Sequence, residues 1–294
     1  MNKTFENHED LDINNGILVA QPKPGKPKGP PQNLRPVTLL NSIRKVLSTI
    51  ALTRIRHAVE NYISCSQSGF RPNRSTSDVV WAHRWISAKV LNYAEIEIDI
   101  TGIDMSAAFD TIDRKQLLQL LTNLVTEDEK RIIQFLLSNT TLNVKISGAN
   151  TEEPFLTNIG TPQGDNVLFI GYLEQALKNV RSTLDSPSNT TEIVYADDID
   201  FIGHQPVNVK KIEETLKVHK LKVNVDKTEH TSVRKHSEEW KTSKKVGSLL
   251  GSKEDIEHRK HLSNIALNKM EQIWDRADKT KQRTRIRLYN TLMR

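Results

Sequence analysis

Cysteine is nearly absent from this sequence, because Cys65 is the only one among 294 residues. A single thiol excludes an intrachain disulfide and any zinc site built on several thiolates. Long hydrophobic runs are lacking too: no apolar stretch reaches the length of about 18 residues that a membrane helix needs, and residues 1–12 are too polar for a secretion signal. We therefore expect a soluble, intracellular protein with no membrane partner. Both the nucleus and the cytoplasm fit this expectation.

Apolar residues are sparse, and positive charge is unevenly distributed. Hydrophobic residues make up 36% of the chain, below the usual apolar share of roughly 45–50%, so the protein can bury a core but is polar for its size. The formal net charge is +6, and residues 255–294 alone carry ten Lys and Arg against five Asp and Glu. This surplus favours an anionic partner such as nucleic acid. A solvated helical face is the alternative interpretation.

The spacing of apolar residues predicts a mixture of helices and short strands. Helical spacing and capping signals, such as Asn41 and the pair Thr126 and Glu129, predict helices near 41–59, 75–90, 114–124, 127–138, 168–182 and 207–219, and a helical C-terminal end. Alternation and turn residues predict a strand at 96–104, two short strands within 142–156, hairpins at 193–203 and 246–251, and a strand at 221–225. The proline-rich and lysine-rich stretch 22–31 is predicted to be an extended linker.

Two segments bring aspartates to the ends of predicted strands. Asp104 ends the alternating strand, and Asp197 and Asp198 occupy the turn of the hairpin IVYADDIDFIG. Adjacent carboxylates resist joint ionisation, although aspartate is also an ordinary turn residue. Magnesium prefers oxygen ligands, and two magnesium ions can neutralise the charge on the attacking and leaving oxygens of phosphoryl transfer. The pattern therefore favours a site in which these three aspartates hold two magnesium ions.

Seven motifs follow one another along the chain: QPKPGKPKGPPQNLRPVTLL (21–40), QSGFRPNRST (67–76), GIDMSAAFDTIDR (102–114), GTPQGD (160–165), YADD (195–198), LKVNVDKTE (221–229) and VGSLLG (246–251). In this order they resemble the reverse transcriptase domain of a non-LTR (LINE-like) retrotransposon. The resemblance implies an α+β, right-hand polymerase fold with an antiparallel palm sheet, helical fingers and a truncated helical thumb. It implies an N-terminal tail and fingers at 1–95, a palm with inserted fingers and palm helices at 96–235, and a primer-grip hairpin with the start of a thumb at 236–294.

The same resemblance implies an RNA-directed DNA polymerase, a nucleotidyltransferase that extends a primer 3′-hydroxyl. Its partners would be an RNA template, a DNA primer and deoxynucleoside triphosphates (dNTPs), and its cofactors two Mg²⁺ ions; the oligomeric state is left open. Asp104, Asp197 and Asp198 resemble the catalytic, metal-binding carboxylates. Lys227 resembles the lysine that acts as a general acid near the leaving pyrophosphate, with a surface lysine as the alternative.

The resemblance also assigns nucleotide-binding residues. Phe109 resembles the aromatic residue under the incoming sugar, where its ring leaves no room for a 2′-hydroxyl; a core phenylalanine is the alternative. Lys23 and Arg35 resemble the basic pair that grips the triphosphate, and Lys23 has the alternative of a solvated linker. The remaining assigned residues are Arg71, Gly160, Gln163 and Gly164.

The sequence departs from the family pattern after GTPQG. Family members generally continue as G-D-x-L-S-P-V-L-F, whereas Asp165 and Asn166 pass directly to Val167, so that Leu-Ser-Pro is missing. Losing three residues from a helix rotates the downstream residues by about 300° and shortens the helix by about 4.5 Å. No upstream endonuclease is recognisable, and the thumb pattern stops early at Arg294. The alternative function is therefore a catalytically inactive retrotransposon remnant that only binds nucleic acid. A weaker alternative is an RNA-templated RNA polymerase, which Phe109 disfavours.

Overall fold

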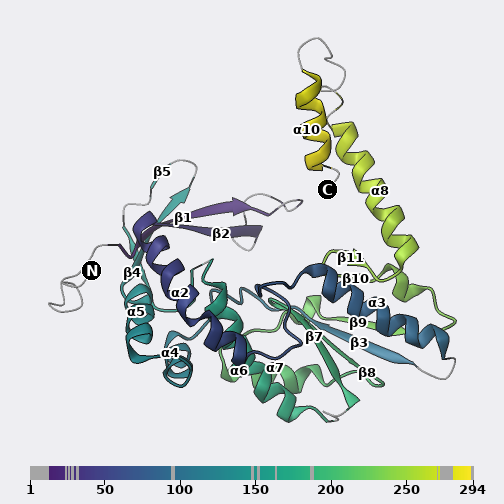
Figure 1. Cartoon of the computed structure of the whole chain (residues 1–294), viewed down its shortest axis with the longest axis horizontal. Helices are drawn as coiled ribbons and strands as arrows, with labels where there is room; N and C mark the ends of the chain where they lie inside the picture. The colour runs from purple at the N-terminus through teal and green to yellow at the C-terminus, as the bar shows by residue number, and fades with distance from the viewer. Residues whose placement is uncertain are drawn as a thin grey trace. The chain divides into compact units, whose positions relative to one another are not determined.

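The computed structural model describes residues 13–23, 25, 27, 30, 33–93, 97–146, 149–150, 153–162, 164–185, 189–269, 271 and 281–292. The chain forms two compact units, and each draws on two stretches of sequence. Figure 1 labels the helices and strands along the chain. The first unit takes Met1–Ser75 and Thr101–His230, and the second takes Thr76–Ile100 and Thr231–Arg294. In the part of the chain described here, no helix is both long and apolar enough to cross a membrane.

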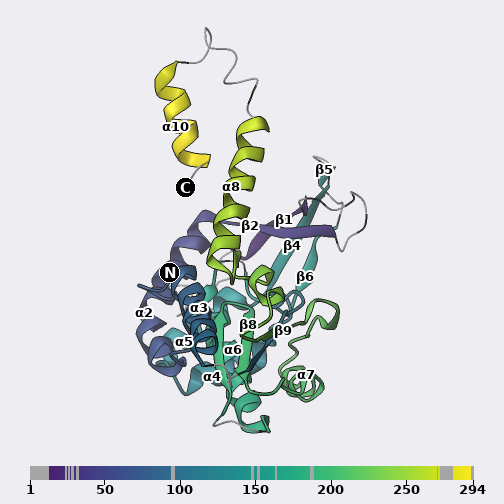
Figure 2. The same cartoon turned by 90° about the vertical axis from the view of Figure 1, so that its right-hand side faces the viewer.

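The first unit begins with a sheet of which the sequence predicted only the strands within 142–156. Its strands are β1 (Asn15–Pro22), β2 (Leu34–Leu40), β4 (Thr140–Ile146), β5 (Ala149–Asn150) and β6 (Phe155–Thr157). The order is β2-β1-β4-β5, and β6 also pairs with β4 (Figure 2). β1 and β2 are antiparallel, whereas β1 and β4 are parallel. The predicted linker thus joins two strands of a hairpin, and three strands replace the two expected within 142–156.

Five helices of the first unit surround its core: α2 (Ser42–Tyr62), α4 (Arg114–Thr122), α5 (Glu127–Leu137), α6 (Asn166–Thr183) and α7 (Val209–Val218). Two predicted caps are confirmed. Asn41 accepts a hydrogen bond of 2.8 Å from the backbone N–H of Ile43, and Thr126 and Glu129 form a complete capping box. α6 lies against α2, α4 and α7 and contributes Phe169, Tyr172 and Leu173, none of them measurably exposed.

A second sheet has the strand order β7-β8-β3-β9. Its strands are β7 (Thr191–Tyr195), β8 (Asp198–Gly203), β3 (Ile98–Ile103) and β9 (Glu229–Val233). The predicted hairpin is confirmed, because β7 and β8 pair antiparallel and close with Tyr195 opposite Asp198. The predicted strand at 221–225 is wrong. Val223 makes one isolated bridge to Met105, and the chain then turns into a 3₁₀ helix at Val225–Lys227.

The second unit contains α3 (Thr76–Asn92), the short strands β10 (Lys244–Lys245) and β11 (Ser248–Leu249), and the helices α8 (Ser252–Lys269) and α10 (Gln282–Leu292). The hairpin predicted at 246–251 is present as the antiparallel pair β10–β11. Asp255 accepts hydrogen bonds from Arg84, Arg259 and the backbone N–H of Leu249. In the C-terminal end predicted to be helical, the apolar side chains of Leu262 and Ile265 are 49% and 38% exposed, while Met270 and Ile273 lie outside the described residues.

Candidate active site

Asp104 and Lys227 are brought together by a short backbone pairing after β3. Residues 222–224 run alongside 104–106: the N–H of Ser106 donates to the carbonyl of Lys222 at 2.9 Å, and the N–H of Asn224 donates to the carbonyl of Asp104 at 2.8 Å. The 3₁₀ helix after this pairing places Lys227 Nζ 3.2 Å from Asp104 Oδ2. The Asp104 side chain is 32% exposed and that of Lys227 66% exposed. Both groups are therefore open to a ligand from solvent.

Asp197 occupies the turn between β7 and β8, where its carboxylate interacts electrostatically with that of Asp104. Burial raises the pKa of Asp197, the negative charge of Asp104 raises it further, and Lys227 opposes the shift. The turn depends on Ala196, which has a left-handed backbone with φ of 57°. Asp198 is exposed at the first position of β8. The structure therefore associates Asp104, Asp197 and Lys227.

The donor set of these residues suits magnesium in part. Within the described ranges, no group of three or more His, Cys, Asp or Glu side chains is arranged to hold a metal ion. Two neighbouring carboxylates are nevertheless what Mg²⁺ usually takes from a protein, with phosphate oxygens and water completing its shell. Asp104 and Asp197 would hold such an ion, which would also relieve their mutual repulsion. The role of Asp198 as a third ligand stays a prediction.

Gln67, the first residue of the motif QSGFRPNRST, was assigned no role from the sequence but contacts the turn that carries Asp197. Gln67 forms a parallel bridge with Val194 of β7. Its side-chain Oε1 accepts hydrogen bonds from the N–H of Gly69 at 2.7 Å and of Ala196 at 3.0 Å. Its Nε2 donates to the carbonyl of Ala196 at 3.3 Å. The available signal was the motif QSGFRPNRST, but nothing local in it indicates a contact with the YADD turn.

Phe109 packs in an aromatic cluster beside the candidate site. Its ring stacks on Phe169 of α6 with centroids 4.1 Å apart and meets the edge of Phe70 at 6.0 Å. The ring is partly buried against the core. Gly160 packs against the backbone of Phe109. It has φ of 76°, and a Cβ added to it would lie 3.0 Å from the backbone oxygen of Phe109. The lack of a side chain at Gly160 therefore allows its backbone to approach that of Phe109 and Asp110.

The loop between Gly160 and α6 is only partly described, and Gln163 lies outside the described residues. Gly164 has φ of 120° and nothing within 4 Å of an added Cβ. Asp165 is buried and accepts a hydrogen bond of 2.6 Å from Ser48 Oγ, and burial raises the pKa of its carboxyl. α6 begins at the next residue, two residues before the predicted start. Asp165 thus leads straight into the helix.

The predicted basic residues have different surroundings. Lys23 and Arg35 lie at the same end of the β1–β2 hairpin, where Gln21 is opposite Arg35 and the backbone N–H of Lys23 donates to the carbonyl of Asn33 at 2.8 Å. The guanidinium of Arg71 is instead engaged by the protein. It donates to Glu60 Oε2 at 2.8 Å and to the carbonyls of Ser64 at 2.9 Å and Gln67 at 3.1 Å. A direct nucleotide contact by Arg71 would compete with these bonds.

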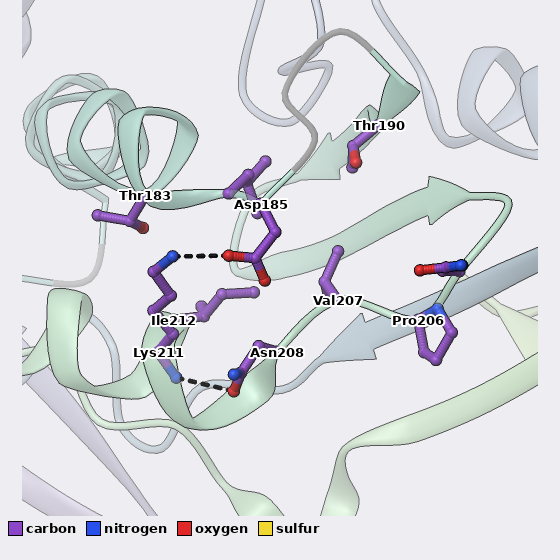
Figure 3. A pocket seen from close by; sticks show the side chains of 10 residues that line it. Thr183, Asp185, Thr190, Pro206, Val207, Asn208, Lys211 and Ile212 are labelled. Carbon is purple, nitrogen blue, oxygen red and sulfur yellow. Dashed lines mark hydrogen bonds and ion pairs between the residues drawn. The ribbon is translucent and has the colours of Figure 1, made fainter.

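Two cavities of the first unit differ in their relation to the predicted residues. A cavity of about 90 Å³ lies where the end of α6 meets the start of α7 (Figure 3). There Lys211 Nζ is 2.8 Å from Asp185 Oδ1, and no predicted site residue contributes to the lining. A larger cavity of about 500 Å³ is lined by Gly160, by Arg114 and by residues of β1, β2, β4 and β6. Of these two, the larger cavity adjoins the predicted nucleotide-binding loop.

The sequence and fold were compared with known proteins. The family described as "Reverse transcriptase (RNA-dependent DNA polymerase)" matches residues 21–277. The chain is 24% identical over 158 residues to the retrovirus-related Pol polyprotein from type-1 retrotransposable element R2 of Popillia japonica. It is 26% identical over 145 residues to the probable RNA-directed DNA polymerase from transposon BS of Drosophila melanogaster. These matches cover 52% and 48% of this chain but only 22% and 16% of those proteins.

Solved structures give the same fold. Telomerase from Candida tropicalis, truncated from its C-terminal domain, has a TM-score of 0.57 at 13% identity, covering 84% of this chain and 56% of that chain. The same enzyme in complex with a TWJ fragment of telomeric RNA has a TM-score of 0.58 at 12% identity, covering 82% and 44%. At such identity the likeness shows the fold alone, which is the expected right-hand polymerase fold. Because the family match covers most of the sequence and the curated relatives are of the non-LTR type, the chain belongs to the reverse transcriptase (RNA-dependent DNA polymerase) family.

Proposed function

We propose that this chain is an RNA-directed DNA polymerase, which extends a primer 3′-hydroxyl on an RNA template with dNTPs. The observation that carries the proposal is the association of Asp104, Asp197 and Lys227, two carboxylates and an ammonium group contributed by three separate segments. Phosphoryl transfer requires positioning and charge neutralisation rather than covalent chemistry from the protein. Magnesium, when bound, would supply the neutralisation at the attacking and leaving oxygens.

The residues of the chain would divide the remaining work. Asp104 and Asp197 would orient the reacting phosphate by holding the ions, and Asp198 is a candidate additional ligand. Lys227 would deliver a proton from Nζ to the pyrophosphate as it leaves. The Phe109 ring is fixed by Phe169 and Phe70. An aromatic ring held in this way would exclude the 2′-hydroxyl of a ribonucleotide and so select deoxynucleotides.

The test is primer extension on a primed RNA template with dNTPs and magnesium, using Asp104→Asn and Asp197→Asn as matched controls. We expect the parent chain to extend the primer and both variants to fail while still binding the primer-template duplex in a gel-shift assay. Extension by either variant would contradict the role of its carboxylate. Absence of extension by the parent chain, with duplex binding retained, would overturn the proposal.

That last outcome would support the second candidate, a remnant that only binds nucleic acid. The specific observation in its favour is the connection before α6, where Asp165 is followed at once by the helix and makes no capping hydrogen bond with its side chain. Small displacements matter in such a site, because a misplacement of about 1 Å can lower a rate about a hundredfold.

A further inference from the structure

The turn that carries Asp197 is held in an unfavourable backbone conformation. Ala196 has φ of 57°, a left-handed conformation that residues other than glycine adopt at a cost in energy. The next residue, Asp197, is half-buried beside the like charge of Asp104. The left-handed backbone of Ala196 and the repulsion between the two carboxylates both favour a rearrangement of the turn that would move Asp197 away from Asp104. The folded structure must therefore contain contacts that keep the turn in place.

Gln67 supplies these contacts. The residue is 2% exposed, and its amide binds both backbone groups of Ala196: Oε1 accepts from the N–H at 3.0 Å, and Nε2 donates to the carbonyl at 3.3 Å. The same Oε1 accepts from the N–H of Gly69 at 2.7 Å. The amide offers an acceptor oxygen and a donor nitrogen at the end of one side chain. Glutamate keeps the acceptors and loses the donor, and methionine loses both.

The approach of the two segments is too close for any side chain on Gly69. A Cβ added there would lie 2.2 Å from the nitrogen and 2.8 Å from the Cα of Ala196. The contact continues along β7, where Ser68 N–H donates to the carbonyl of Val194 at 2.8 Å and Val194 N–H donates to the carbonyl of Ser66 at 3.0 Å. Residues 66–69 thus contact the backbone of residues 194–196 at successive positions.

We infer that Gln67 is a positioning residue for the metal site: it fixes Ala196 and thereby directs the Asp197 carboxylate toward Asp104. Gly69 contributes to the same positioning, because its lack of a side chain allows this segment to lie close to Ala196. The inference rests on the proposed function, in which Asp197 holds magnesium. Gln67 contacts neither substrate nor metal in this scheme, so its loss should affect metal binding and the chemical step more than substrate affinity.

The experiment compares the whole chain with Gln67→Met, Gln67→Glu and Gly69→Ala. Gln116→Met is the matched control, since it removes a hydrogen-bonded glutamine amide on α4, away from the turn. Mn²⁺ binding is measured from the electron paramagnetic resonance signal of the free ion, and kcat and the KM for dNTP are measured by primer extension. Circular dichroism reports whether each variant folds.

For Gln67→Met and Gly69→Ala we expect Mn²⁺ affinity and kcat to fall about tenfold or more, the usual effect of losing an outer-shell contact to a metal ligand. The KM for dNTP should stay within about twofold of the parent value, as for an effect confined to metal placement and the chemical step. Gln67→Glu should lie between parent and Gln67→Met, and Gln116→Met should match the parent.

Parental Mn²⁺ affinity in folded Gln67→Met or Gly69→Ala would overturn the inference. If Gln67→Met does not fold, Gln67→Glu, which keeps two of the three hydrogen bonds, decides in its place. Failure of the proposed function is distinguishable: a parent chain that binds Mn²⁺ but extends no primer contradicts the polymerase, whereas the Mn²⁺ comparison still tests Gln67.

Discussion

Lys227 and Asp104 form an ion pair across the candidate site, with 3.2 Å between Nζ and Oδ2. Both side chains are substantially exposed, so solvent screening makes the pair a weak contributor to stability. The ion pair matters instead for the electrostatics of the neighbouring carboxylates. Lys227 opposes the rise in the pKa of Asp197 that burial and Asp104 cause. The lysine therefore acts as a counter-ion to the carboxylates.

Replacing Lys227 by alanine should slow the chemical step and leave nucleotide affinity nearly unchanged. Loss of a general acid lowers a rate by about a hundredfold or more. Single-turnover extension at varied dNTP concentration separates the two quantities. Lys222→Ala is the control, because this exposed lysine lies in the same segment and uses only its backbone carbonyl at the site. A reduced dNTP affinity with an unchanged rate would assign Lys227 to binding instead.

Replacing Phe109 by alanine should lower both stability and sugar selection. The ring loses its stack on Phe169, and the free energy of unfolding should fall by about 3 kcal/mol, the low end for phenylalanine to alanine, because Phe109 is only partly buried. If the ring excludes the 2′-hydroxyl, kcat/KM for ribonucleotides should rise relative to deoxynucleotides. Urea unfolding and competitive incorporation measure the two effects. Lower stability with unchanged selection would identify Phe109 as a core residue alone.

Arg71→Ala should destabilise the fold rather than weaken nucleotide binding. The substitution removes the bonds to two carbonyls and leaves Glu60 without this partner in a half-buried setting. Hydrogen bonds to charged groups contribute about 1.5–3 kcal/mol each, so we expect the free energy of unfolding to fall by at least about 2 kcal/mol. Thermal unfolding and the KM for dNTP are the measurements. An increase in the KM for dNTP without a loss of stability would instead support the predicted nucleotide contact.

His219 should make the first unit less stable in mild acid. The residue is 5% exposed, burial lowers its pKa, and its Nδ1 has no hydrogen-bond partner among the described residues. Because the folded pKa lies below the unfolded value, the contribution to stability is present above about pH 6.5 and is lost as the pH falls through the folded pKa. In His219→Gln the fall in unfolding free energy between pH 7 and pH 5 should be smaller than in the parent. Equal pH dependence would contradict this assignment.

Sequence reasoning succeeded where the signal lay within a few residues. The caps at Asn41 and Thr126 and the hairpin at 193–203 each depend on neighbours along the chain. It missed β1, whose parallel partner β4 lies more than a hundred residues further on. It missed the contact of Gln67 with Ala196 for the same reason, since 129 positions separate them. The aspartates were recognisable because their motifs are local, but the contacts that position Asp197 are not.

The deletion predicted before α6 can be tested by inserting Leu-Ser-Pro after Asn166. Serine followed by proline is a favourable start for a helix, with serine as the N-cap and proline at the first helical position. α6 could then begin at the new proline and keep Phe169 stacked on Phe109, while Asp165 keeps its bond to Ser48. If the deletion limits activity, primer extension should rise at unchanged thermal stability. A Gly-Ser-Gly insertion controls for length, because it provides no proline at the first helical position. Equal extension by the parent and both insertions would show that the deletion does not limit synthesis.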